Sequence, residues 1–223
     1  MKIIKSVLGL LSISMLAGTV WAAELPKVLI IGDSISKGYA PVVREQLKDV
    51  AEVDFPVDNC MHTGNGLKMM KTWLGTNKWD VIHFNFGIWD TQLLSKDGAL
   101  LNTEIDPPPG ARVRFTPEQY RENLTKIVDL LQATGAKLVW ASTTPVMARK
   151  GKRFEAILKD NEVAAAIMKQ HKIPIDDLYA YVLPNAKAWQ NTDGCHFGVP
   201  GNEQIAKKVA ESIQQALSGA KSK

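Results

Sequence analysis

Residues 27–38 have the sequence KVLIIGDSISKG, and the expected fold of the chain follows from them. The apolar run, rich in β-branched residues, reaches Gly32 and stops at Ser34. This pattern predicts a buried parallel strand that ends in a tight turn and is followed by a helix. In open α/β sheets, ligands bind beyond the carboxyl ends of the strands, where the positive end of such a helix also favours an anion. We therefore expect Ser34 at a place where ligands bind.

Ser34 has two interpretations when this segment is taken alone. Serine is a preferred N-cap residue of helices, and it is also a nucleophile once a general base lies beside it. The segment Asp193-Gly194-Cys195-His196 near the other end of the chain favours the second interpretation. An aspartate three residues before a histidine can hold the imidazole N–H and fix the tautomer of a general base. Ser34, His196 and Asp193 are thus the candidate nucleophile, base and orienting residue.

These two segments resemble the first and last sequence blocks of the SGNH (GDSL-type) hydrolase superfamily. Gly32-Asp33-Ser34-Ile35 is similar to the first block, and Asp193-x-x-His196 is similar to the last. The resemblance covers nearly all of the mature chain and implies an α/β fold, a three-layer α/β/α sandwich with a mostly parallel, flavodoxin-like sheet. It also implies a serine esterase in which Ser34, Asp193 and His196 form the catalytic triad.

The two blocks between these ends resemble the superfamily less evenly. A superfamily glycine that follows an asparagine by five positions gives its N–H to the oxyanion. Gly64 has this spacing, although a second glycine nearby leaves the register open. The third block is normally Gly-x-Asn-Asp, but here Trp89 stands in the asparagine position. This sequence resembles that of a bacterial exported subgroup of the superfamily. The resemblance thus implies backbone donors at Ser34 and Gly64 and a third donor at Asn85 or Trp89. A packed aromatic wall is the other interpretation of Trp89.

Strand-like and helix-like patterns alternate along the chain, which predicts a parallel sheet covered by helices. The further strands are expected at 50–55, 81–86, 137–141 and 173–175, and the helices at 40–49, 67–74, 117–133, 154–170 and 202–217. The clearest helix start is Thr116, with Pro117 in the first turn and Gln119 returning the capping bond. Residues 91–116 do not fit the alternation. They either shape the substrate cleft or form a surface insertion.

The first 22 residues have the features of a secretory signal peptide, with a basic start, an apolar segment and small residues before the cleavage site. This predicts a single mature domain at 23–223 in the periplasm or outside the cell. The apolar segment is too short to span a bilayer comfortably, although an uncleaved anchor is the alternative. No other run is long enough for a stable membrane span. Cleavage reduces the 27 basic residues to 25 against 23 acidic ones, and a net charge of +2 gives no reason to expect nucleic acid binding.

Cys60 and Cys195 are the only two cysteines of the chain. In an exported protein such a pair can be joined by a disulfide, and the resemblance places both in loops near the active site. A Cys60–Cys195 bridge and two buried thiols are the two alternatives. No His, Cys or Asp cluster has metal-ligand spacing and no phosphate-binding loop is present, so neither a metal nor another cofactor is expected.

Together these features predict an exported serine esterase that removes small acyl groups, such as acetyl, from carbohydrate. The substrate would then be a small-molecule or glycan acyl ester. The enzyme alternatives are a lysophospholipase or thioesterase that acts on lipids and an O-acetyltransferase that uses the same triad. A degenerate hydrolase that only binds a glycan or a partner protein is a further alternative, against which the intact triad argues. A flavodoxin-like cofactor-binding domain would not require the Asp-x-x-His segment.

Overall fold

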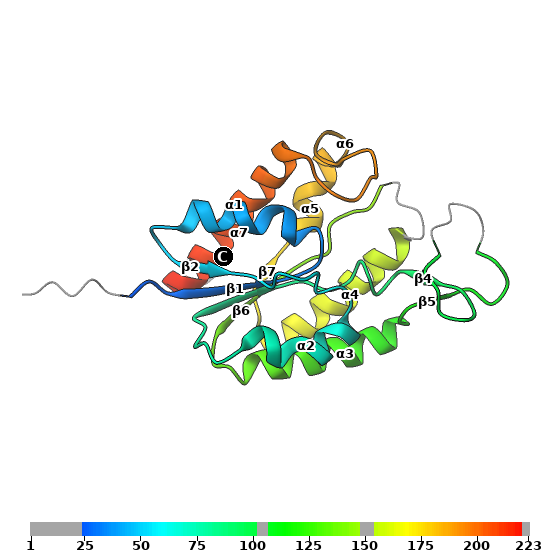
Figure 1. The fold of residues 1–223 in the computed structure, drawn as a ribbon, viewed down its shortest axis with the longest axis horizontal. Coiled ribbons are helices and arrows are strands. Elements are labelled where there is room, and N and C mark those ends of the chain that lie inside the picture. Colours follow the sequence, from blue (N-terminus) through cyan, green and yellow to red (C-terminus); the bar gives the residue numbers. More distant parts are fainter. Residues whose placement is uncertain (1–23, 102–106, 148–153, 220–223) are drawn as a thin grey trace, which may run out of the picture.

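The computed structural model describes residues 24–101, 107–147 and 154–219 of the 223-residue chain. The expected signal peptide at residues 1–22 lies outside these ranges, and export therefore stays a prediction. Figure 1 shows an α/β body from which a small two-stranded segment projects at one end.

Five parallel strands form the central sheet, in the order β2-β1-β3-β6-β7. Their bounds are β1 Lys27–Ile31, β2 Glu52–Asp54, β3 Val81–Phe84, β6 Lys137–Ala141 and β7 Ile175–Asp176. Ile31 pairs with Phe84, and Phe84 pairs with Trp140, so the central strands end level with one another. Each parallel pairing needs a long crossover connection, and these connections place helices on the faces of the sheet.

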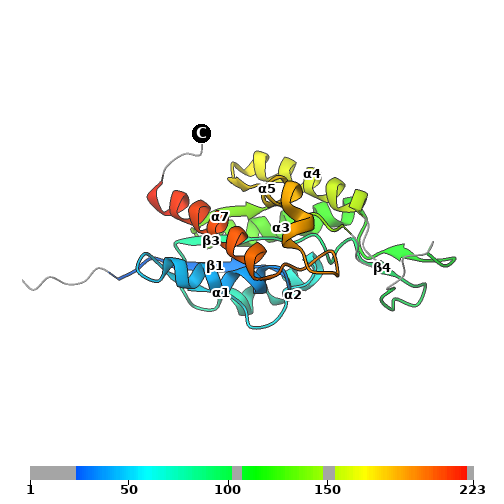
Figure 2. The ribbon, with the colours of Figure 1, turned by 90° about the horizontal axis from the view of Figure 1, so that it is seen from above.

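Helices cover both faces of the sheet (Figures 1 and 2). One face carries α1 (Ser36–Leu47) and α7 (Val199–Ser218). The other carries α2 (Thr63–Leu74), α3 (Pro117–Gln132) and α4 (Phe154–His171). The predicted three-layer α/β/α sandwich with a parallel sheet is therefore confirmed.

Strand β1 is buried on both of its faces. Val28 and Ile30 belong to the core under α1 and α7, whereas Leu29 and Ile31 belong to the core under α2, α3 and α4. A strand buried in this way needs a continuous apolar run rather than an alternating pattern, as its sequence has.

Most predicted elements are present, with their ends shifted by a few residues. β6 occupies the predicted range, and α3 begins with the predicted capping box of Thr116 and Gln119. Helix α1 begins at Ser36, four residues before its predicted start. Asp33 explains the earlier start, because it accepts hydrogen bonds from the Ile35 and Lys37 N–H groups and from the Ser36 hydroxyl.

Residues 91–116 contain more regular structure than the sequence indicated. β4 (Leu93–Leu94) and β5 (Arg112–Val113) form an antiparallel pair that projects beyond the carboxyl end of the sheet (Figure 1). Part of this segment, residues 102–106, lies outside the described residues. Three short elements before α7 were also not predicted, namely α5 (Leu178–Val182), the 3-10 helix η1 (Leu183–Asn185) and α6 (Ala186–Trp189).

The two cysteines are buried and no disulfide joins them. Cys60 packs in the core under α2, α3 and α4, whereas Cys195 packs in the core under α1 and α7, on the opposite face of the sheet. The disulfide alternative was wrong, and the alternative of two buried thiols is confirmed. Burial also raises the pKa of the Cys60 thiol to about 12, which keeps it protonated.

Candidate active site

Ser34 lies in the turn between β1 and α1, at the carboxyl end of the sheet. The N-cap residue of α1 is Ile35, so Ser34 does not cap that helix. The side chain is partly exposed, and its Oγ lies 2.8 Å from Nε2 of His196. The structure thus brings the candidate nucleophile together with the predicted base, across 162 residues of sequence.

Asp193 holds the imidazole of His196 from the side opposite Ser34. Its Oδ2 lies 2.6 Å from Nδ1 of His196, and its Oδ1 accepts the N–H groups of Cys195 and His196, each at 2.9 Å. Burial raises the pKa of the carboxyl, but these hydrogen bonds and the attraction to His196 outweigh it and lower the pKa of Asp193 to about 2. The carboxylate is therefore ionised at neutral pH. It keeps a proton on Nδ1 and leaves Nε2 to accept the hydroxyl proton of Ser34.

Backbone hydrogen bonds hold the loop that carries these two residues. Gly194 has φ of 63°, a conformation that favours glycine and closes the turn between the aspartate and the histidine. The Met147 N–H donates to the Gly194 carbonyl at 2.8 Å, and the Asn191 N–H donates to the His196 carbonyl at 2.7 Å. The loop is therefore attached both to itself and to the segment that follows β6.

The two expected backbone donors, the N–H groups of Ser34 and Gly64, meet no acceptor among the described residues. Gly64 is the second residue of α2, where the positive end of the helix favours negative charge. The Cys60 N–H donates to the Gly32 carbonyl at 3.2 Å, which attaches the segment before α2 to the turn of Ser34. Both N–H groups are thus left to bind an oxyanion.

The first turn of α2 is fixed by two side chains. The buried Asp90 accepts the Thr63 N–H at 3.0 Å and the Thr63 hydroxyl at 2.5 Å. His62 is the N-cap, and its Nδ1 accepts the Asn65 N–H at 3.1 Å. These bonds satisfy the N–H groups of Thr63 and Asn65, on either side of Gly64. The N–H of Gly64 itself meets no acceptor among the described residues. Neither role was predicted from the sequence. A polar side chain three residues before Asn65 has N-cap spacing and was the available signal for His62.

No protein-family model and no curated protein matches this sequence. Solved structures match it over most of its length. A lipase/acylhydrolase from Enterococcus faecalis has a TM-score of 0.68 at 20% identity, over 89% of this chain and 100% of that one. The acetyl xylan esterase AlAXEase has a TM-score of 0.66 at 16% identity, over 84% of this chain and 99% of that one. A candidate SGNH hydrolase from Slackia heliotrinireducens has a TM-score of 0.62 at 18% identity, over 85% of this chain and 100% of that one. The chain has the SGNH hydrolase fold.

Within this SGNH fold, Asn85 does not provide a free amide at the site. It lies just after β3, and its amide nitrogen donates to the Ala141 carbonyl at 2.8 Å and to the Thr143 hydroxyl at 3.1 Å. An amide carries two hydrogens, and both are directed to the segment at the end of β6. Asn85 therefore ties two strand ends together.

Trp89 stands where the sequence resemblance leads us to expect the asparagine of the SGNH pattern. Its side chain is partly buried and packs against the core under α1 and α7. Its carbonyl accepts a hydrogen bond from Nε of Arg114 at 3.1 Å, which ties the base of the projecting segment to the third block. We assign no oxyanion donor to the third block.

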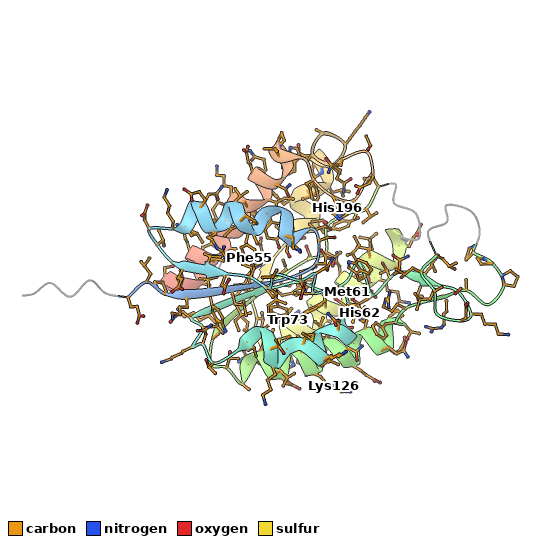
Figure 3. All side chains as sticks on the ribbon, viewed as in Figure 1. Phe55, Met61, His62, Trp73, Lys126 and His196 are labelled. Carbon is orange, nitrogen blue, oxygen red and sulfur yellow. The ribbon has the colours of Figure 1, made fainter. Side chains whose placement is uncertain are left out.

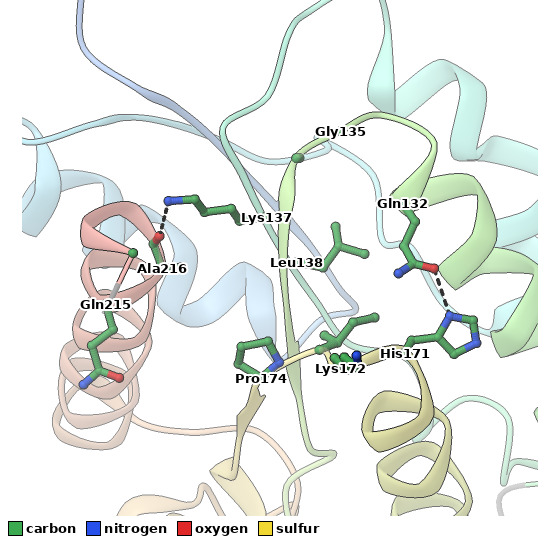
Figure 4. Close-up of a pocket in the computed structure, with 12 residues that line it drawn as sticks. Gln132, Gly135, Lys137, Leu138, His171, Lys172, Pro174, Gln215 and Ala216 are labelled. Atoms are coloured by element: carbon green, nitrogen blue, oxygen red, sulfur yellow. Dashed lines mark hydrogen bonds between the residues drawn. The ribbon is translucent and has the colours of Figure 1, made fainter. Parts of the chain in front are cut away.

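An open pocket of about 750 Å³ lies at the other end of the SGNH fold (Figure 4). It is lined by the start of β6 and by the last turns of α3, α4 and α7. Lys137 Nζ donates to the Ala216 carbonyl at 2.9 Å, and His171 Nδ1 lies 2.8 Å from Gln132 Oε1. The pocket is remote from the triad, so we do not place the substrate there.

No group of three or more His, Cys, Asp or Glu in the described ranges is placed to hold a metal ion. No helix in that part of the chain combines the length and the apolar character needed to cross a membrane. His83, a further histidine, is buried in β3 and lies 3.1 Å from Asp176, away from the triad.

Proposed function

We propose that this chain is a serine hydrolase of the SGNH superfamily that cleaves carboxylic esters. The observation that carries the proposal is the continuous set of contacts from Ser34 Oγ to His196 at 2.8 Å and from His196 to Asp193 at 2.6 Å. These groups are partly exposed and lie where open α/β sheets bind ligands. The fold shared with solved acylhydrolases and esterases supports the same reaction class.

The proposed reaction has two steps. Ser34 Oγ attacks the ester carbonyl while Nε2 of His196 takes its proton, and Asp193 stabilises the imidazolium that forms. The N–H groups of Ser34 and Gly64 bind the oxyanion of the tetrahedral intermediate. His196 returns the proton to the leaving alcohol and so leaves an acyl group on Ser34. A water molecule, deprotonated by His196, then attacks the acyl carbon, and the acid leaves as Ser34 regains its proton.

We further propose that the acyl group is small, such as acetyl, and that the alcohol is a carbohydrate. Three partly exposed aromatic side chains pack along the α1 and α7 side of the sheet end, namely Trp89, Tyr179 and Trp189. Their flat apolar faces suit the apolar face of a sugar ring. The Trp189 carbonyl accepts the Gly198 N–H, which places this residue beside the triad loop. The likeness to an acetyl xylan esterase supports this substrate class.

The test compares the mature wild-type protein with Ser34→Ala on p-nitrophenyl esters of increasing acyl length. We expect hydrolysis of the acetate by the wild type and a loss of at least about 10⁴-fold in kcat/KM in the variant. Preference for acetate over octanoate, and release of acetate from acetylated xylan, support a small-acyl carbohydrate esterase. Preference for octanoate would contradict the small-acyl proposal and favour an enzyme that acts on lipids. If no ester reacts and a fluorophosphonate does not label Ser34, the hydrolase proposal fails.

Export is part of the proposal and has its own test. Cleavage after Ala22 would give a mature chain that begins with Ala23. N-terminal sequencing of the protein recovered from the periplasm or medium of an expressing bacterium identifies the first residue. An intact Met1 in the cell fraction would contradict export.

A further inference from the structure

His62 presents one N–H donor in a fixed tautomer. Its Nδ1 accepts the Asn65 N–H at 3.1 Å, and an accepting ring nitrogen carries no proton. Burial, and to a lesser extent the charge of Arg114, lowers the pKa of His62 to about 4, so the ring is neutral at physiological pH. A neutral imidazole with an unprotonated Nδ1 carries its proton on Nε2. Helix capping therefore determines which nitrogen of His62 can donate.

The ring that carries this donor packs beside Gly64, the residue of the expected backbone donor. A Cβ atom built on Gly64 would lie 3.2 Å from Nδ1 and 3.4 Å from Cε1 of His62, so the ring edge formed by these two atoms is the one that borders Gly64. The ring of His62 meets Phe115 edge to face, with centroids 5.4 Å apart, and this contact restricts its rotation. The side chain is partly exposed, and no acceptor among the described residues meets Nε2–H. The donor is thus held in place without a partner in that part of the protein.

His62 and His196 lie on opposite sides of the sheet. Figure 3 shows His196 on the α1 and α7 side of the sheet and His62 on the α2 side. The bond from the Cys60 N–H to the Gly32 carbonyl attaches the two sides to each other, two residues from His62 and two from Ser34. An ester bound between Ser34 Oγ and the Gly64 N–H would therefore lie beside the segment that carries His62, two residues before Gly64.

Asn85 offers the ester no free amide, so a further side-chain donor would have to come from another segment. The amide hydrogens of Asn85 are directed to Ala141 and Thr143, and the ring of Trp89 packs against the core. We propose that His62 donates its Nε2–H to an oxygen of the bound ester, beside the oxyanion. This inference rests on the proposed function and adds a substrate-binding side chain to the triad and the two backbone donors.

The alternative is that His62 only caps α2, and His62→Asn separates the two roles. Asparagine is a preferred N-cap, so its Oδ1 keeps an acceptor for the Asn65 N–H and the melting temperature should not fall. Its side chain is too short to place a donor where Nε2 lies. We expect kcat/KM for the ester to fall at least about tenfold, the usual effect of losing one good hydrogen bond. His171→Asn, on the exposed end of α4, is the matched control and should leave kcat/KM unchanged.

Kinetics and spectroscopy together decide the inference. A fall in kcat at constant KM means that the contact forms in the transition state, and a rise in KM means that the bound ester already makes it, and either result supports the proposal. Wild-type kinetics in His62→Asn would overturn it. Nitrogen-15 NMR of the wild-type protein gives a readout without turnover, because a proton found on Nδ1 of His62 overturns the proposal whatever the activity. If the wild-type protein is inactive and Ser34 is unreactive, the proposed hydrolase function itself fails. This outcome differs from one in which the wild type is active and His62→Asn has wild-type kinetics, which overturns only the role of His62.

Discussion

The charge of Asp193 is expected to act through His196 rather than on the substrate. Asp193→Asn keeps the shape of the side chain but removes the charge, and its amide favours the wrong tautomer of the imidazole. We expect kcat to fall on the order of 10⁴-fold with little change in KM, as measured with the p-nitrophenyl ester that the wild type prefers. The exposed Asp129→Asn on α3 is the control and should match the wild type. A wild-type kcat in Asp193→Asn would contradict the assigned role.

Single residues differ in how far the sequence predicts their contacts. Ser34 and His196 carry local signals, a strand end with glycine and an Asp-x-x-His spacing, and the structure places them in contact. The contact of Asn85 depends on Ala141, 56 residues away, and on how β3 and β6 end beside each other. No local pattern reports that arrangement, so the sequence left the third oxyanion donor open.

The start of α2 depends on Thr63, which connects the helix to the third block. Thr63→Val removes the hydroxyl that donates to Asp90 and accepts from Asn123 at 3.1 Å. It leaves the buried Asp90 carboxyl and the partly buried Asn123 amide each short of a partner. We expect a loss of about 1–3 kcal/mol in the free energy of unfolding, measured with urea, and a lower kcat because Gly64 shifts. Thr63→Ser keeps the hydroxyl and should retain both properties. Equal stability of the two variants would show that the hydroxyl does not hold α2.

Helices and strands were predictable from the sequence where they were long enough to display a hydrophobic period or a helix-capping pattern. Helix α3 runs for 16 residues and has a full capping box, so its start was predicted to the residue. By contrast, α5 has five residues and α6 has four, which is too short for a helical period to stand out. The two-residue strands β4 and β5 are defined by their antiparallel pairing with each other. The sequence of either segment alone does not indicate that pairing.

For the whole molecule, two carboxyls with shifted pKa values, the partly exposed Asp193 and the buried Asp160, affect stability in opposite directions. The pKa of Asp193 is lowered to about 2, so the stability that its hydrogen bonds contribute is present above about pH 4 and is lost as the pH falls toward 2. The pKa of Asp160 is raised to about 7, first by burial and then by the charge of Asp90. The folded protein thus retains a proton there that the unfolded chain releases near pH 4. Stability from this group is highest below pH 4 and is lost as the pH rises to about 7.

Asp160→Asn should therefore stabilise the protein at alkaline pH. The side chain is 4% exposed on α4, and at pH 8 the wild-type carboxyl is ionised in a place that disfavours charge. A neutral amide avoids this cost, and we expect the melting temperature at pH 8 to rise by a few degrees, about 2–4 °C per kcal/mol. At pH 4 the difference should shrink, because the wild-type carboxyl is then protonated in the folded state. Glu162→Gln, exposed two residues further along α4, should show no such pH dependence. A lower melting temperature of Asp160→Asn at pH 8 would mean that the carboxylate has a stabilising cationic partner and would contradict the raised pKa.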